Sequence, residues 1–164
     1  MISAKMTHAL NEQINKELYS AYYYLAMACY LEDLNFDGMA NFMKLQAKEE
    51  TGHAMKIYSY INEQGGRVVL EAIEKPRTDF DSPQQVFELG LDHEKFVTKS
   101  IYNLVSLAQE EKDYATQQFL DWFVKEQVEE EATMDTIVKK FKLAGGHGQA
   151  MLMLDAQLGQ RSEH

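Results

Sequence analysis

The segment KEETGH at residues 48–53 is the most informative stretch for the fold, because it is repeated. A segment with a similar pattern, KEQVEE, follows at residues 125–130. A constant offset of 77 residues aligns position 50 with 127 and position 53 with 130, and it also aligns Glu17 with Glu94. The first half of the chain therefore maps onto the second as an internal pseudo-repeat whose clearest matches are polar. We expect the two halves to pack together about an approximate twofold axis.

Acidic residues interrupt the apolar stripes of four segments. On a helix, residues three apart project from the same side one turn along, so Glu50 and His53 share a face. Glu17, Glu94 and Glu130 lie at helical spacing from apolar neighbours in three other segments. One inward glutamate could be a surface residue at the edge of a stripe. Four of them, one per helix, indicate that the carboxylates meet in the core.

Apolar residues recur at helical spacing along most of the chain. We expect four long helices and one short helix, at about residues 4–32, 38–64, 83–111, 114–143 and 149–158. The apolar positions of the first two helices include Leu10, Ile14, Leu18, Ala21, Leu25, Ala28, Phe42, Leu45, Met55 and Ile61. Asp37 and Ser82 are predicted to cap the second and third helices at their starts. Glycines at 65–66 and 145–146 are predicted to end the second and fourth.

The lengths of the connectors set the topology. The links before residue 38 and before residue 114 are short, so each joins an antiparallel pair of helices. Residues 65–82 form a connector that can span the bundle when extended, which makes the second and third helices parallel. The sequence therefore predicts an all-α protein, a four-helix bundle with one long crossover plus a short fifth helix. We expect a single domain over residues 1–164.

Composition argues against several classes of protein. The formal net charge of −10 argues against nucleic acid as a partner, because phosphate binding requires a basic face. The longest apolar run, residues 21–31, is shorter than the roughly 20 residues that cross a bilayer, so no membrane partner is expected. Cys29 is the only cysteine, and the amino-terminal segment has no apolar signal core. We therefore expect a cytoplasmic protein.

A dry cluster of carboxylates requires a counter-charge. Burying each carboxylate costs several kcal/mol, and mutual repulsion adds to that cost. Protonation would relieve one or two members of the cluster, whereas multivalent cations would relieve all of them. Oxygen-rich ligation with a single histidine favours iron or manganese over zinc. Glu50 is the natural bridge between two such ions.

The pattern resembles the ferritin-like di-iron bundles, in which glutamates from two helices join Glu-x-x-His motifs from the other two. This chain has Glu17, Glu94 and one complete motif at residues 50–53, whereas its second motif is altered to Gln127-Val128-Glu129-Glu130. A symmetrical di-iron protein has glutamate in place of Gln127. The altered copy is similar to that of bacterial non-haem ferritins rather than to oxidases or bacterioferritins. The resemblance extends from residue 1 to about residue 158.

The resemblance implies a ferroxidase centre that oxidises Fe(II) with dioxygen or hydrogen peroxide. Glu17, Glu50 and His53 would hold the first iron, and Glu50, Glu94 and Glu130 would hold the second. The other implied site residues are Gln127 and Tyr24 beside the centre, and Glu49, Glu126, Glu129 and Glu130 at a third iron site.

The resemblance also implies a homo-oligomeric shell of twenty-four subunits that stores ferric mineral. The fifth helix would pack at a four-fold axis of that shell, although it could simply close the end of the bundle. Haem is not expected, because Thr51 and Gly52 occupy the interval in which bacterioferritins have their haem-binding methionine.

Several alternatives remain open from the residues alone. The chain could be a di-metal oxidase with an organic substrate, which would need an apolar pocket beside the site. It could also be a helical interaction module whose glutamates face solvent. A DNA-protecting mini-ferritin is disfavoured, because those proteins lack the fifth helix.

Tyr24 could act in redox chemistry or hydrogen bonding, or could only pack in the core, and Trp122 is expected in the core or at an interface. Among the residues without an expected role, Cys29 should be buried and His8, His93 and His147 should lie on the surface.

Overall fold

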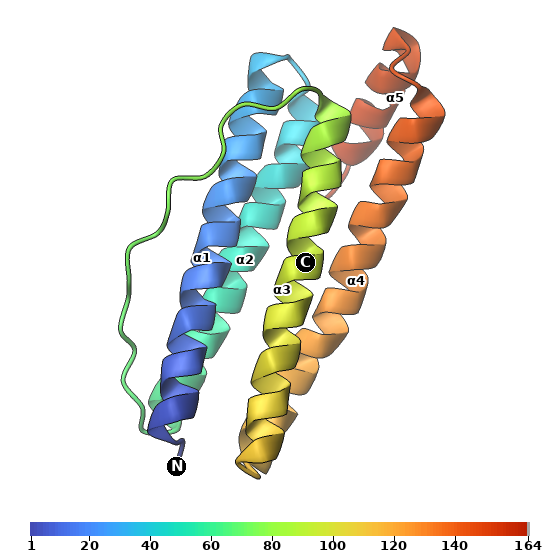
Figure 1. Ribbon diagram of the computed structural model, residues 1–164. Helices are drawn as coiled ribbons and strands as arrows, with labels where there is room; N and C mark the ends of the chain where they lie inside the picture. Colours follow the sequence, from blue (N-terminus) through green and yellow to red (C-terminus); the bar gives the residue numbers. More distant parts are fainter. Residues whose placement is uncertain (164) are drawn as a thin grey trace.

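A computed structural model describes residues 1–163 of the chain. The helices are α1 (Ala4–Asp33), α2 (Asp37–Glu63), α3 (Pro83–Glu110), α4 (Tyr114–Ala144) and α5 (Gly148–Leu158). The axes of the four long helices are roughly aligned with one another, and α5 lies beside the end of the bundle at which α4 finishes (Figure 1). Each helix begins and ends within one residue of the predicted bounds. The predicted fold class is confirmed.

The packing follows the predicted hairpins. α1 packs along α2 and α3 along α4, and α1 also packs against α3. α2 and α4 are further apart, since none of their Cα atoms lie within 8 Å of one another. The bundle is therefore closed on the side of α1 and α3 and wider along the seam between α2 and α4.

The crossover runs the length of the bundle beside α1, which makes α2 and α3 parallel (Figure 1). The side chain of Asn11 donates to the carbonyl of Arg67 at 2.9 Å and accepts from the amide of Val69 at 2.9 Å. One turn further along α1, Asn15 donates to the carbonyl of Ala72 at 3.1 Å. The buried ring of Phe80 then packs against aromatic rings of α1. Side chains of α1 thus fix a segment that has no helix of its own.

The helix ends agree with the predictions in three places and differ in one. Gly65 has a positive φ of 77° just after the end of α2, as predicted. Ser82 accepts a hydrogen bond from the amide of Gln85, as predicted. Gly145 has the positive φ of 61° that ends α4. The prediction for Asp37 was wrong, because Asp37 is already helical and makes no capping bond. Asp155 of α5 takes that role, since its Oδ1 accepts from the amide of Met39 at 2.8 Å. The start of α2 is therefore completed by a helix from the other end of the sequence.

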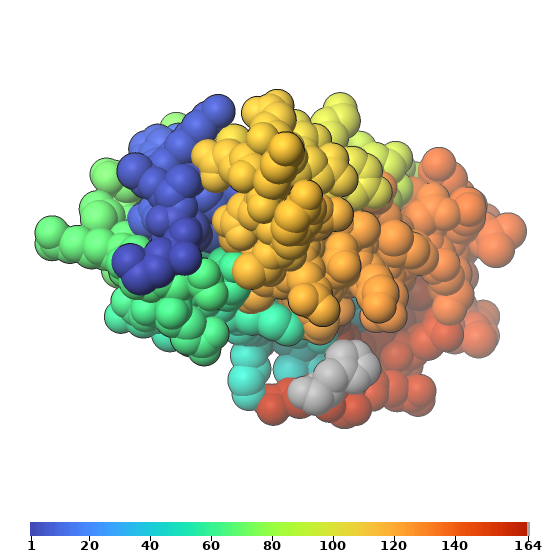
Figure 2. Space-filling model, turned by 90° about the horizontal axis from the view of Figure 1, so that it is seen from below, coloured from blue at the N-terminus to red at the C-terminus, as the bar shows by residue number. Residues whose placement is uncertain are grey.

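The interior consists of two apolar clusters. One includes Met27, Met43 and Phe141 at the end of the bundle beside α5, and the other includes Leu10, Ile61 and Leu120 near the opposite end. At that opposite end, Ser3 donates to Glu111 at 2.7 Å, so the start of α1 meets the turn between α3 and α4 (Figure 2). The buried polar residues separate the two clusters along the helices.

Cys29, which was predicted to be buried, is exposed, and so are two of the apolar helix positions named from the sequence. Leu25 and Met55 are 44% and 51% exposed, and Cys29 is exposed as well. Leu25 and Cys29 are four residues apart and therefore share one side of α1. Apolar character alone did not reveal on which side of the helix they lie. Across residues 1–163, no helix is long and apolar enough to cross a membrane.

Gly38 is a sensitive point of the α2–α5 contact, because a Cβ atom there would lie 2.0 Å from the carbonyl oxygen of Asp155. Gly38→Ala is expected to lower the free energy of unfolding by about 1–3 kcal/mol through overpacking. Gly52→Ala is the matched control, since nothing lies within 4 Å of a Cβ atom at that position of the same helix. The control should be neutral or stabilising. Denaturant unfolding of both variants tests this, and equal stabilities would contradict it.

Candidate metal centre

A layer of buried polar side chains lies between the two apolar clusters. Each long helix contributes to it: α1 through Glu17, α2 through Glu50 and His53, α3 through Glu94, and α4 through Gln127 and Glu130. All six are at most 6% exposed. The interpretation of the chain as an interaction module with solvent-facing glutamates is therefore wrong. The structure brings together all six residues that the sequence predicted for this layer.

The layer contains two groups of three residues that can each offer one ligand atom within 4.8 Å of the others. The first group is Glu17, Glu50 and His53, and the second is Glu50, Glu94 and Glu130. In the first group, Nδ1 of His53 lies 3.1 Å from Oε2 of Glu50 and 3.7 Å from Oε2 of Glu17. Glu50 belongs to both groups. Two adjacent cation sites that share one carboxylate fit this geometry.

Glu17 is held by a line of hydrogen bonds that reaches the surface between α1 and α3. Lys16 donates to Ser100 at 2.9 Å, Ser100 donates to Gln13 at 2.5 Å, and Gln13 donates to Oε1 of Glu17 at 3.0 Å. The other oxygen, Oε2, is buried and has no hydrogen-bond partner among residues 1–163. A buried carboxylate oxygen without a donor is energetically costly. This oxygen points to a cation as its missing partner.

Glu94 is oriented by two neighbours that the sequence had placed near the site. The hydroxyl of the fully buried Tyr24 donates to Oε1 of Glu94. The amide of Gln127 donates to Oε2 of Glu94 at 3.0 Å and also contacts the hydroxyl of Thr98 at 3.2 Å. Tyr24 therefore makes a hydrogen bond at the site in addition to packing in the core. Both oxygens of Glu94 are fixed in direction before any ion arrives.

The pKa values show how poorly the layer tolerates its own charge. Burial, together with the charge of Glu94, raises the pKa of Glu50 well above its usual value and that of Glu130 to about 9. Burial also raises the pKa of Glu94, although its hydrogen bonds oppose the shift. Burial would raise the pKa of Glu17 as well, but the nearby side chains of His53 and Glu50 outweigh it, so the pKa is lowered. Cations would replace the protons that the metal-free layer retains.

The predicted third site is only partly assembled. Its four glutamates, Glu49, Glu126, Glu129 and Glu130, line a cavity of about 230 Å³ at the seam between α2 and α4. The group of ligand atoms within reach of one another there is instead His53, Glu126 and Glu130. Within residues 1–163, no such group includes Glu49 or Glu129.

Sequence reasoning missed the glutamines that support the layer. Gln46 is 1% exposed, and its amide donates to Glu130 at 2.5 Å and to Glu50 at 3.4 Å. Gln13 serves Glu17 in the same way. Each glutamine precedes a buried glutamate by four residues, which is the spacing of neighbours on a helix, so this signal was present in the sequence.

One histidine prediction was wrong. His93 is half-buried rather than on the surface, because Ser20 lies 2.7 Å from its Nε2 atom and the rings of Tyr19 and Tyr23 pack against it. Burial lowers its pKa to about 4. It lines the outer side of the α1–α3 contact and is not among the grouped ligand atoms.

Comparisons with known proteins agree with this geometry. A family model described as a ferritin-like domain matches residues 7–144. The chain belongs to the ferritin family. This ferritin is 44% identical to the bacterial non-heme ferritin of Staphylococcus saprophyticus, over 99% of this chain and 97% of the relative. It is 41% identical to the protein of the same name from Staphylococcus aureus, over 99% and 98% of the two chains.

Solved structures give the same answer for the fold. The open-pore ferritin of the hyperthermophilic archaeon Archaeoglobus fulgidus is 49% identical and superposes with a TM-score of 0.98, over 99% of this chain and 100% of that one. An engineered closed form of the Archaeoglobus fulgidus ferritin gives a TM-score of 0.99 at 49% identity, over the whole of both chains. Family membership makes iron storage the general function of the protein.

The stability of the metal-free protein should fall as the pH rises. The folded state keeps a proton on Glu130 up to a pKa of about 9, whereas the ordinary pKa of a glutamate is 4.5, so the folded state binds more protons between these values. Stability from that proton is complete below the unfolded pKa and is lost as the pH rises through the folded one. The raised pKa values of Glu50 and His53 act in the same direction. Denaturant unfolding of metal-free protein at about pH 6 and about pH 9 measures the loss.

Glu130→Gln removes the titrating group but keeps its shape, so the loss of stability with pH should be smaller in this variant. Glu110→Gln, at an exposed position of α3, should behave like the wild type. A loss in Glu130→Gln as large as in the wild type would contradict the assignment to the buried layer.

Proposed function

We propose that this ferritin is a ferroxidase, which oxidises Fe(II) to Fe(III) at a di-iron site inside each subunit and stores the product as ferric mineral. The observation that carries this proposal is the position of Glu50, which belongs to both groups of ligand atoms. Four buried carboxylates surround the two positions, and His53 is the only grouped residue of the two triads that is not an acid.

The proposed ligands follow from the two groups. Glu17, Glu50 and His53 hold the first iron, and Glu50, Glu94 and Glu130 hold the second. Because carboxylates dominate, the set suits hard or borderline ions such as iron. Few protein ligands per ion leave coordination positions open for an oxidant.

The chemistry balances with either oxidant. Two Fe(II) ions each give one electron, and the pair of electrons reduces dioxygen to peroxide or hydrogen peroxide to two hydroxide ions. The protein supplies the positions and the negative charge, which stabilises Fe(III) more than Fe(II). Tyr24 and Gln127 hold Glu94 in place, and Gln46 does the same for Glu130.

The site gives little support for an organic substrate. The cavity that adjoins the layer is lined by glutamates, Gln46, Thr133 and Arg161, with Phe42 as its only apolar ring. An apolar substrate would find poor complementarity there. Small inorganic reactants suit such a cavity better, which favours iron oxidation over oxidation of an organic compound.

Storage in a shell is the second part of the proposal. Membership of the ferritin family supports a multi-subunit shell, which we propose contains twenty-four subunits. Leu143, Leu152 and Met153 of α4 and α5 are 87%, 64% and 68% exposed. Exposed apolar side chains of this size are typical of a contact between subunits. A net charge of −10 favours the accumulation of cations.

Removal of a shared or first-site ligand should stop rapid oxidation. Glu50→Ala and His53→Ala are each expected to lower the initial rate of Fe(II) oxidation by about tenfold or more, because each removes a protein ligand. Stopped-flow mixing of anaerobic Fe(II)-loaded protein with oxygenated buffer measures the rate. Circular dichroism should show unchanged helix content, since two apolar clusters hold the bundle.

Glu12→Ala is the matched control, because Glu12 is a glutamate of α1 whose side chain is 61% exposed. Its oxidation rate should equal that of the wild type. Wild-type rates in Glu50→Ala and His53→Ala would refute the di-iron site.

Aerobic loading tests storage and assembly together. Fe(II) added stepwise in air should remain in solution with the protein, in amounts well above the two or three ions that its sites can hold per subunit. Native mass determination should give a shell of twenty-four subunits before and after loading. A monomer, or precipitation of iron beyond the first few equivalents, would contradict the storage proposal.

A further inference from the structure

We propose that Arg161 is a built-in cation that occupies the acidic cavity beside the di-iron site and must leave before a metal ion can fill that cavity. The inference rests on the proposed function, since it concerns the route by which oxidised iron would leave the layer. It assigns a role to the segment that follows α5, for which the sequence analysis predicted no function.

Arg161 is held by four contacts at the seam between α2 and α4. Its guanidinium lies 3.0 Å from a carboxylate oxygen of Glu49 and donates to the side-chain oxygen of Gln46 at 2.9 Å. It also donates to the carbonyl of Phe42 at 3.2 Å and lies 4.4 Å from the centre of that ring. The side chain is only 14% exposed. These contacts place the charge inside the cavity rather than in solvent.

Arg161 explains why the third site is only partly assembled. The four glutamates line one cavity, yet Glu49 pairs with Arg161 and is absent from the group formed by His53, Glu126 and Glu130. The guanidinium is a planar cation that matches carboxylate geometry. It therefore takes the place that a metal ion would need in order to gather Glu49 with Glu126 and Glu130.

Gln46 connects this cation to the di-iron layer. Its oxygen accepts from Arg161 at 2.9 Å, so its amide nitrogen faces Glu130 at 2.5 Å and Glu50 at 3.4 Å. Arg161 thus fixes the orientation of the amide that holds Glu130. Loss of the arginine contact would free Gln46 and change the hydrogen bond of a carboxylate shared by the second group and the cavity.

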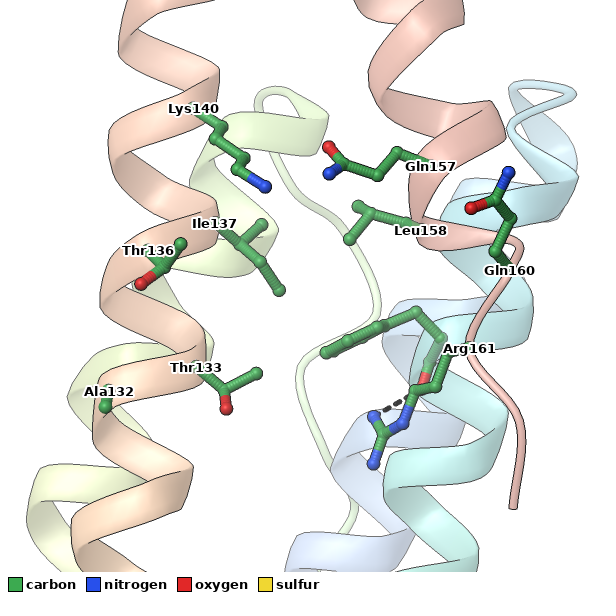
Figure 3. Close-up of a pocket in the computed structure, with 10 residues that line it drawn as sticks. Ala132, Thr133, Thr136, Ile137, Lys140, Gln157, Leu158, Gln160 and Arg161 are labelled. Atoms are coloured by element: carbon green, nitrogen blue, oxygen red, sulfur yellow. Dashed lines mark hydrogen bonds between the residues drawn. The ribbon is translucent and has the colours of Figure 1, made fainter. Parts of the chain in front are cut away.

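The tail is placed by α5 rather than by the cavity alone. The link between Asp155 and Met39 docks α5 on the start of α2, and the chain then continues alongside α2 (Figure 3). In the same view, Arg161 points from this segment into the space between α2 and α4. Further along, Lys48 pairs with Glu163 at 2.5 Å on the exposed side of α2.

Arg161 is a cation tethered to the chain, and it competes with a free metal ion by occupying the cavity. If the cavity is free of Arg161 in about a tenth of the molecules, the apparent affinity for a metal ion is about tenfold lower than the intrinsic affinity. Such competition disfavours weakly bound ions in the cavity and admits highly charged ones. Fe(III) would displace the arginine more readily than Fe(II), because its attraction to three or four carboxylates is stronger.

The test uses crystals of the metal-free shell soaked in a series of Tb³⁺ concentrations. Tb³⁺ is a trivalent, redox-inactive ion that prefers oxygen ligands, and anomalous scattering gives its occupancy in the cavity at each concentration. The variants are Arg161→Ala, Arg161→Lys and the control Lys48→Ala, which loosens the same tail without touching the cavity. No oxidation is needed for the readout, so failure of the ferroxidase proposal would leave it interpretable.

We expect half-occupancy of the cavity at about tenfold lower Tb³⁺ concentration in Arg161→Ala than in the wild type. Arg161→Lys should lie between them, and Lys48→Ala should equal the wild type. In wild-type crystals, the pair of Arg161 and Glu49 should be lost as the Tb³⁺ peak grows. Equal or lower occupancy in Arg161→Ala, or Tb³⁺ bound while Arg161 still contacts Glu49, would overturn the proposal.

Discussion

The structure depends on the dry layer in which four carboxylates face one another. Charges at this density are unstable in a protein interior, and the raised pKa values of Glu50 and Glu130 express that instability. The rest of the bundle holds the four carboxylates in place despite their mutual repulsion. Two apolar clusters supply the stability, one on either side, and glutamines one helical turn away supply hydrogen bonds. The fold thus holds the four carboxylates in position to receive cations.

The layer is not symmetrical, although the two halves of the chain are similar. The pseudo-repeat pairs His53 with Glu130 and Glu50 with Gln127, so one group of candidate ligands contains a histidine and the other contains only carboxylates. The bundle is closed where α1 meets α3 and wider where α2 meets α4. The all-carboxylate position adjoins that wider seam through Glu130, which also lines the acidic cavity. The group that contains only carboxylates and the wider seam of the bundle therefore lie on the same side of the molecule.

The sequence predicted the bundle and its inward carboxylates well, because both follow from spacing along single helices. Glu17, Glu50, Glu94 and Glu130 interrupt apolar stripes at helical intervals, and connector lengths leave few ways to join the helices. No spacing pattern in the sequence indicated the contacts between segments that are far apart in the chain. The capping of α2 by Asp155 and the contact of Arg161 with Gln46 each join residues more than a hundred positions apart. Exposure of Leu25 and Cys29 was also missed, since an apolar side chain does not reveal which neighbour covers it.

The docking of α5 has a consequence for protein engineering. Asp155 completes the start of α2, and the segment after α5 lies against the same helix that carries Glu50 and His53. A fusion partner joined to the carboxyl end would therefore pull on a segment that contacts the metal layer through one intermediate side chain. The amino terminus is at the far end of the bundle, where Met1 is fully exposed (Figure 1). Affinity tags, fluorophores and displayed antigens belong on the amino terminus.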